Sequence, residues 1–376
     1  MKTVSRKIPT LSEVLAEQEN LAGLCADRPL ATTEIFSGNA YYGTDFVLKS
    51  YADVTLNRPL KCVLPHGIPL HEESIWSAEN KVPLPVILYY PSRLAHVYRE
   101  KSGKVALRGA SPFLYVSDLI GGQTLPTRKG TLFFLSHSSH WVTAVSEFES
   151  LAETLGALPE QFHPITVCIY WRDFNLGHHL PFVRRGLKVM SAGHIYDPHF
   201  LIRFHYLCSM HQYSCSNELG SHLFMSVKAG CAYFHLPGNA RQYHAESGKP
   251  AYSLHVPIEV LNSLDTVFAQ PRDNVSPEQL AIVDDYVGAA KKLTPQDMRT
   301  LLQFCERLDR FGTGTLEGRR YFAFPRIIKR ALWYEPKQRL RKMLKNLLLL
   351  LLRRCPGSTR LRMLLSRVFP SLRTDD

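Results

Sequence analysis

The sequence predicts an α/β protein of two lobes followed by a basic helical tail. Short apolar runs typical of buried strands alternate with segments of helical spacing, which is the pattern of parallel sheets covered by helices. The 376 residues are enough for two domains, and 45% of them are hydrophobic, which is enough for sizeable cores. The pattern divides the chain into three regions, at 1–125, 126–275 and 276–376.

The predicted first lobe, residues 1–125, contains three strand-like runs. They are KCVLPHG (61–67), VPLPVILYY (82–90) and SPFLYVSDLIGG (111–122), the last closed by a glycine pair. A segment that opens with Pro-Ser and continues with helical spacing follows the second run. The polar, basic stretch TLPTRKG (124–130) is typical of a linker.

The predicted second lobe, residues 126–275, repeats a strand-then-helix unit. Its strands are expected within 131–141, 163–175, 187–197, 212–216 and 231–238. Such a repeat implies a parallel sheet with helices on both faces, whose ligands bind outside the carboxyl ends of the strands. Polar residues follow the apolar runs at Ser136 to His140, Trp171 to Asp173, Ala192 to His194, and Ser216 with Asn217. These positions predict a binding site.

Positive charge is concentrated at the C-terminal end, after two segments that read as helices capped at Ser276 and Thr294. From Tyr321 to Asp376 there are 14 Lys and Arg against three acidic residues, a net charge of +11, whereas the first 320 residues carry 31 against 30. The run at 347–352 is too short to span a bilayer, and basic residues mixed with Leu are typical of helices on an anionic membrane surface. The alternative is a helix packed back on the body; nucleic-acid binding lacks a supporting module.

The remaining features indicate location and redox state. The N-terminal stretch MKTVSRKIPTLSEVLAEQEN lacks an apolar core of signal-peptide length, so export is not expected. The eight cysteines show no CxxC spacing, and several lie in apolar runs, such as Cys62 and Cys168. These features predict reduced, buried cysteines in a cytoplasmic protein. The basic tail adds the expectation that this protein is peripheral at the inner face of the cell membrane.

The stretch CSNELGSHLF (215–224) places four small or polar residues and a histidine around one predicted turn, before a helix. Free N–H groups at the helix start near Gly220 favour an anion, and Ser216, Asn217 and Ser221 add donors. His222 strengthens this interpretation, because capping a helix does not require a histidine. The alternative is an ordinary N-cap, with Ser216 or Asn217 as the capping residue.

Two more strand ends carry histidine. In SHSSH (136–140), His137 is a candidate to remove a proton or to contact a phosphate, and Ser136, Ser138 and Ser139 are candidate anion contacts. In PHGIPL, His66 follows a first-lobe strand and is a candidate general base. The alternatives are a histidine that satisfies a loop carbonyl in the first case and simple turn chemistry in the second.

Two other positions permit more than one interpretation. Arg172 is suited to pairing with a phosphate or carboxylate, but equally to a structural ion pair. His194, beside Gly193 at a strand end, is a candidate ligand contact, and with Asp197 and His199 it forms a possible metal triad. Nothing in the sequence shows that these three side chains converge, so no metal and no cofactor are predicted.

These residues together resemble GT-B glycosyltransferases, which consist of two Rossmann-like lobes. Pro65–Leu70 is similar to the His-Gly-x-Pro-Leu motif of CDP-glycerol glycerophosphotransferases. The stretch Ser136–Phe234, about a hundred residues, resembles uncharacterised proteins of bacterial capsule and O-antigen gene clusters. Those proteins share the HS–S–H strand end, a V-C-x-Y-W strand, an A-G-H-x-x-D turn and an S-N-x-x-G-S/T-H helix start.

The resemblance implies a metal-independent glycosyltransferase that moves a sugar from a nucleotide-sugar donor to a cell-surface glycan or lipid-linked acceptor. It implies that the first lobe is on the acceptor side, that the second binds the donor, and that His66 is the catalytic base. The donor contacts that it implies are Ser216, Asn217, Gly220, Ser221 and His222. The strand-end positions add His137 as a second candidate base, and Ser136, Ser138, Ser139, Arg172 and His194 as further candidate donor contacts. The Asp-Tyr-Ser-Ser of the glycerophosphotransferases is replaced by Cys-Ser-Asn, which argues against CDP-glycerol as donor, and a DxD motif is lacking.

Three alternatives stay open from the sequence. One is a glycerophosphotransferase-like polymer enzyme. Another is a metal-dependent hydrolase that uses His137, His140, His194 and Asp197. The third is a non-catalytic, membrane-bound scaffold that keeps a transferase fold.

Overall fold

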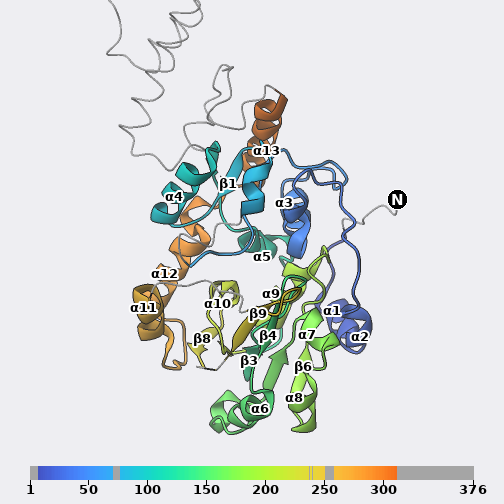
Figure 1. Ribbon diagram of the computed structural model, residues 1–376, viewed down its shortest axis with the longest axis vertical. Helices are drawn as coiled ribbons and strands as arrows, with labels where there is room; N and C mark the ends of the chain where they lie inside the picture. The colour runs from blue at the N-terminus through green and yellow to red at the C-terminus, as the bar shows by residue number, and fades with distance from the viewer. Residues whose placement is uncertain (1–6, 71–76, 237, 239, 250–257, 311–376) are drawn as a thin grey trace, which may run out of the picture.

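The structure is a computed structural model, in which residues 7–70, 77–236, 238, 240–249 and 258–310 are described. A five-stranded parallel sheet is its largest layer (Figure 1). In spatial order the strands are β6 (Lys188–Met190), β5 (Ile165–Cys168), β3 (Thr131–Phe134), β7 (Tyr213–Ser216) and β8 (Ala232–His235). If the five strands of this sheet (β3, β5, β6, β7, β8) are numbered 1 to 5 in chain order, their spatial order is 3-2-1-4-5, the order of doubly wound sheets. The direction in which successive strands are added to the sheet reverses between β3 and β7.

Helices cover both faces of this sheet because its central strands are apolar on both faces. In β3 and the residue after it, Phe133 and Leu135 belong to one hydrophobic core, whereas Leu132 and Phe134 belong to the other. Helices α6 (Phe148–Gly156) and α8 (Leu180–Arg184) pack on the core that contains Phe133. Helices α9 (Phe200–Ser209) and α10 (Ser221–Lys228) pack on the core that contains Leu132. The sequence prediction of a parallel sheet between helices is therefore confirmed.

A second, smaller parallel pair lies above the large sheet in Figure 1. It consists of β1 (Val86–Leu88) and β2 (Ala106–Arg108), joined by α4 (Ser92–Ser102). Val63 adds one parallel bridge to β1, so the predicted strand at 61–67 is reduced to a single paired residue.

The predicted strand at 111–122 is wrong, because the segment is helical. It forms η4 (Pro112–Tyr115) followed by α5 (Val116–Leu119). A short apolar run that is buried on all sides does not distinguish strand from helix by its period. Pro112 fits the first turn of a helix, where its missing N–H costs nothing.

An antiparallel ribbon that the sequence pattern did not indicate lies near the large sheet. It pairs β4 (Val142–Val145) with β9 (Arg241–His244), across almost a hundred residues. Both strands are only partly buried, so they lack the continuous apolar run that revealed the buried strands. The ribbon and the residues next to it place Trp141 and Gln242 at the edge of the cleft described below.

The helices at both ends of the described chain pack against elements that are far away in the sequence. Helices α1 (Leu11–Gln18) and α2 (Leu21–Leu24) lie beside the large sheet, where Gln18 exchanges two hydrogen bonds with the backbone of Ser191. After α11 (Ile258–Phe268), α12 (Pro277–Val287) packs on α10, and α13 (Pro295–Arg310) packs on α3 (Thr44–Tyr51). The predicted caps at Ser276 and Thr294 are confirmed, since each side chain accepts a backbone N–H three residues later.

The remaining described helices are α7 (Trp171–Asn175), η1 (Ser37–Gly43), η3 (Ser77–Lys81), η5 (Glu160–Phe162) and η6 (Ala289–Lys291). Seven cysteines lie in the described ranges, and all are buried and free of disulfides, as predicted. Within these ranges no helix has the length and apolar character needed to cross a membrane. The predicted basic tail lies outside the described residues, and the lobe boundaries near 125 and 275 stay predictions.

Candidate active site

A cleft of about 840 Å³ lies at the carboxyl edge of the large sheet. Its lining combines residues that precede the linker with residues that follow it, so it is walled by both halves of the chain. The polar members of the lining are Tyr42, Thr44, His66, Tyr89, Ser111, His137, Ser139, Tyr170, Glu218, Ser221, His222 and Gln242. The rest is mainly aliphatic and aromatic, as is usual for small-molecule sites.

The two polar loops predicted to form a site meet here. One follows β3 and contributes His137 and Ser139; the other follows β7 and contributes Glu218 and the start of α10. Because β3 and β7 are the neighbours between which the strand order reverses, both loops flank the switch point of the sheet. Ligands of doubly wound sheets bind at this point.

His137 is the most available of the cleft histidines. Its ring meets Tyr170 edge-on, with 4.8 Å between ring centroids. Neither of its ring nitrogens has a hydrogen-bond partner among the described residues, and it is only partly buried. Its ring is close enough to His66, His222 and Glu218 to influence their pKa values electrostatically, so it neighbours the other polar groups of the cleft.

His66 is held more tightly. Its ring stacks on Tyr42 at 5.4 Å, and its backbone N–H donates to the buried carboxylate of Glu79 at 2.9 Å. Burial, with a smaller effect of the neighbouring His137, lowers the pKa of His66 to about 4. Burial also raises the pKa of Glu79 to about 7, although the bonds from His66 and Tyr98 oppose this shift.

The backbone around Tyr42 is constrained where it approaches the second half of the chain. Tyr42 has a φ of 59°, a left-handed conformation that is unfavourable for a bulky residue. Its N–H donates to the carbonyl of Ile195 at 2.6 Å, and a Cβ on Gly43 would lie 2.0 Å from the carbonyl oxygen of Pro198. This contact fixes the ring of Tyr42 against His66, and such strain persists only where the surroundings impose it.

Ser221 and His222, both predicted donor contacts, line the cleft but already have partners. Ser221 Oγ accepts the backbone N–H of Ile68 at 2.9 Å. His222 Nε2 lies 2.9 Å from the carbonyl of Glu218 and 2.8 Å from Ser216 Oγ, and the ring rests on Phe134. Burial lowers the pKa of His222 to about 3, so the ring is neutral at pH 7.

Four other predicted contacts lie under the cleft and do not line it. The backbone N–H of Ser136 donates to Asn217 Oδ1, whose amide returns a bond to Ser136 Oγ. Ser138 Oγ accepts the N–H of Ala144, and Ser216 Oγ bonds the hydroxyl of Tyr233. These buried side chains shape the two polar loops.

Arg172 and His194 also lie outside the cleft lining. Arg172 is on α7, and its Nε is buried without a hydrogen-bond partner in the described part of the chain. His194 is fully buried and packs against Trp171, with 4.1 Å between ring centroids.

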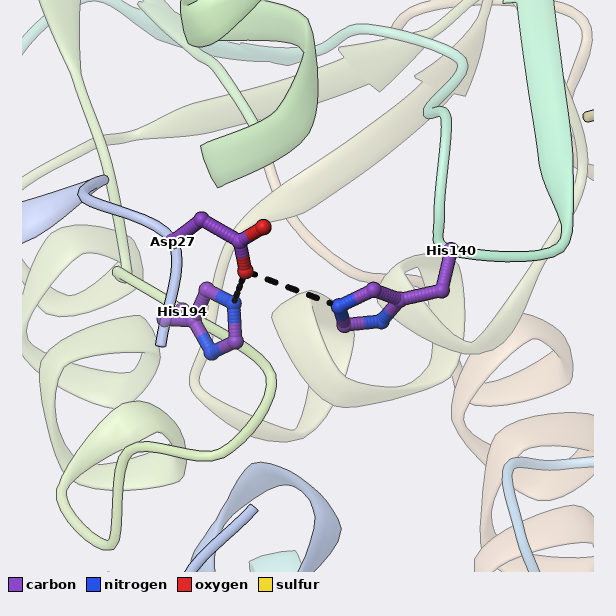
Figure 2. A group of neighbouring side chains, drawn as sticks. All are labelled: Asp27, His140 and His194. Carbon is purple, nitrogen blue, oxygen red and sulfur yellow. Dashed lines mark hydrogen bonds and ion pairs between the residues drawn. The ribbon is translucent and has the colours of Figure 1, made fainter. Parts of the chain in front are cut away.

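His194 belongs instead to a group with Asp27 and His140, brought together from three distant segments (Figure 2). Asp27 Oδ1 lies 3.2 Å from His194 Nε2 and 3.6 Å from His140 Nε2. One candidate ligand atom from each residue lies within 4.8 Å of the others, and two imidazoles with a carboxylate suit zinc. This group is the candidate metal site of the described residues.

The proton position on His194 argues against metal binding in this arrangement. Its Nδ1 accepts the backbone N–H of Tyr196 at 3.1 Å, so in the neutral ring the proton lies on Nε2. A metal ion can bind Nε2 only when that nitrogen is deprotonated, whereas here Nε2 carries a proton and donates it in a hydrogen bond to Asp27. The metal set suggested by the sequence is also divided, because Asp197 pairs with Arg203 and Arg28 while His137 lies in the cleft.

No protein-family model matches the chain, and no curated protein matches it significantly. The cleft and the order of the strands beneath it are therefore the features that indicate a function.

Sequence reasoning missed several residues that line the cleft or support its lining. Glu218 accepts the amide of Gln242 at 2.8 Å, and burial raises the pKa of its carboxyl. Its place inside the motif S-N-x-x-G-S-H was the signal that could have revealed it. Glu79 and Tyr42 carried no such signal, because they act through contacts with His66 that only the fold creates.

Proposed function

We propose that the protein is a glycosyltransferase of the GT-B type, with two Rossmann-like lobes facing the cleft. The donor is a nucleotide sugar, and the acceptor is a cell-surface glycan or a lipid-linked glycan. The observation that carries the proposal is the strand order 3-2-1-4-5, with polar loops after β3 and β7 at its switch point. Nucleotide phosphates bind at such points, next to a helix start.

In the proposed mechanism the donor phosphate lies between the start of α10 and His137. The described cleft lining contains no Lys or Arg, so the positive end of the α10 dipole and the N–H of an imidazole balance the negative charge. The bond between the anomeric carbon and the phosphate oxygen breaks while the acceptor oxygen bonds that carbon. Charge that develops on the leaving phosphate is stabilised by groups already in position.

The acceptor hydroxyl loses its proton to His66 or His137. His137 has no described hydrogen-bond partner to compete for its nitrogens, which favours it in the ligand-free protein. His66 has a pKa of about 4 without ligand, and a phosphate nearby would raise that pKa towards neutrality. Each assignment is tested separately by substitution to Ala.

The proposal is tested by thermal-shift measurements on the full-length protein with UDP-glucose, GDP-mannose, ADP-glucose and CDP-glucose, with and without EDTA. One donor class is expected to raise Tm, because a ligand that binds only the folded state stabilises it, and EDTA is expected to leave the shift unchanged. His137→Ala should abolish the shift, while the exposed His96→Ala serves as the matched control. A protein that no nucleotide or nucleotide sugar stabilises would contradict the proposal.

A further inference from the structure

The hydrogen bonds of His222 fix which of its ring nitrogens carries the proton. Nε2 lies 2.9 Å from the carbonyl oxygen of Glu218, and a carbonyl oxygen only accepts. Nε2 must therefore be the donor, and the bond to Ser216 Oγ at 2.8 Å is compatible with that role. In a neutral imidazole the other nitrogen, Nδ1, is then bare and can only accept.

The bare nitrogen lies at the start of α10, beside the cleft. A Cβ built on Gly220 would lie 3.3 Å from His222 Nδ1 and 3.1 Å from Cε1, so this edge of the ring faces the glycine. Both residues line the cleft. No group of the described residues donates a hydrogen bond to Nδ1, and the packing on Phe134, with 5.2 Å between ring centroids, holds the ring in place.

We propose that His222 Nδ1 accepts a hydrogen bond from a hydroxyl group of the ligand, and that in the proposed transferase this hydroxyl belongs to the sugar of the donor. The inference rests on the proposed function for the identity of the ligand. It changes the role expected of His222 from a phosphate contact to a hydroxyl contact. A phosphate oxygen has no proton to donate, so its lone pairs would face the lone pair of His222 Nδ1. His222 thus selects a hydroxyl and leaves the phosphate to His137 and the N–H groups of α10.

Two substitutions separate the two edges of the ring. His222→Gln places its amide near the position of Nε2, so it can keep the bond to the Glu218 carbonyl but loses the acceptor beside Gly220. His222→Asn places its amide near the position of Nδ1, so it keeps an acceptor there but loses the bond to Glu218. The pair therefore distinguishes a ligand contact from a structural contact of the same side chain.

Affinity is measured by calorimetry on the full-length protein, for the nucleotide sugar that stabilises the wild type and for its free nucleotide. His222→Gln should weaken the sugar nucleotide by roughly five- to tenfold, the value of one neutral hydrogen bond, and leave the free nucleotide unchanged. His222→Asn should keep the wild-type ratio between the two ligands. Equal weakening of both ligands by His222→Gln, or no weakening, overturns the inference.

A measurement without ligand tests the proton position directly. Long-range ¹H–¹⁵N correlation spectra of protein labelled at histidine distinguish a bare from a protonated ring nitrogen, and His222→Gln assigns the signal. A proton on Nε2 is expected, and a proton on Nδ1 overturns the inference. If the wild type binds no nucleotide at all, the proposed function fails, whereas this spectrum still decides the state of His222.

Discussion

Ser221 Oγ accepts a hydrogen bond from the backbone N–H of Ile68 at 2.9 Å, although 153 residues separate them. The bond joins the turn that carries His66 to the first residue of α10. Gly67 lies against the same oxygen, since a Cβ at that position would be 3.4 Å from it. The two walls of the cleft are thus attached to each other beside the candidate base, and Ser221 has a structural part in the site.

The first prediction concerns this attachment. Ser221→Ala removes the acceptor and leaves the Ile68 N–H unpaired, so the free energy of unfolding should fall by about 0.5–1.5 kcal/mol. Because the His66 turn is then less firmly held, nucleotide-sugar binding should weaken as well. Urea denaturation and thermal shift measure the two effects. Ser150→Ala on the exposed face of α6 is the control, and a Ser221→Ala protein that matches it in both assays would refute the prediction.

The second prediction concerns Gly220. Its φ of −167° is open to any residue, so Gly220→Ala should fold with nearly wild-type stability. The added Cβ would lie 3.1 Å from the His222 ring, which must move, and ligand binding should be impaired. Gly156→Ala, where a Cβ meets nothing within 4 Å, is the matched control. Unchanged affinity in Gly220→Ala would show that this space is not needed.

The large sheet could be predicted because each of its central strands is recognisable from its own short stretch of sequence. The runs around β3 and β5 are continuously apolar, since both faces are buried, and a repeat of strand and helix implies parallel pairing. The rule that sites form at the carboxyl ends of such strands then placed His137 and His222 in one cleft. Local pattern and global fold agree in this part of the molecule.

The parts that could not be predicted depend on partners far away in the chain. Asp27 meets His194 across 167 residues, and no local pattern announces such a contact. Ser138 and Ser139 are adjacent hydroxyls in one motif, yet Ser138 bonds Ala144 under the cleft while Ser139 lines it. The residue types indicate which chemical groups are available for a site. Only the tertiary structure determines which of these side chains line the cleft.

The third prediction concerns a buried ion pair in the first half of the chain, between Lys49 and Glu34. Lys49, 1% exposed, contacts Glu34, which is fully buried, and Asp45. Lys49→Met removes the cation and leaves both carboxylates uncompensated, so unfolding should become easier by about 3–5 kcal/mol. Urea denaturation measures this loss. The double variant Lys49→Met with Glu34→Gln should recover part of it, and a loss below 1 kcal/mol in the single variant would contradict the prediction.

The fourth prediction concerns the group of Asp27, His140 and His194. Because Nε2 of His194 is protonated, zinc or manganese should not raise Tm, and EDTA should not lower it. Asp27→Asn should change stability only slightly, since Asp27 is 61% exposed and its pairing is screened by solvent. Stoichiometric metal in the purified protein, lost together with stability on chelation, would instead restore the hydrolase alternative.

The fifth prediction concerns stability at low pH. Burial lowers the pKa of His205 from 6.5 to about 4, and that of His66, His194 and His222 in the same direction. Between pH 6.5 and 4 the unfolded chain therefore binds more protons than the folded protein, and the free energy of unfolding should fall as the pH falls. Glu79 acts in the opposite sense between about 4.5 and 7, because its pKa is raised in the folded protein.

His205 isolates this effect from the cleft, since it packs on Phe113 and does not line the cleft itself. His205→Phe keeps a ring at this position and removes one titrating group, whose Nδ1 is buried without a partner among the described residues. Urea midpoints measured at constant ionic strength from pH 7.5 to 4 should decline less steeply for this variant than for the wild type. Parallel curves would mean that His205 takes up its proton at the same pH whether the chain is folded or unfolded.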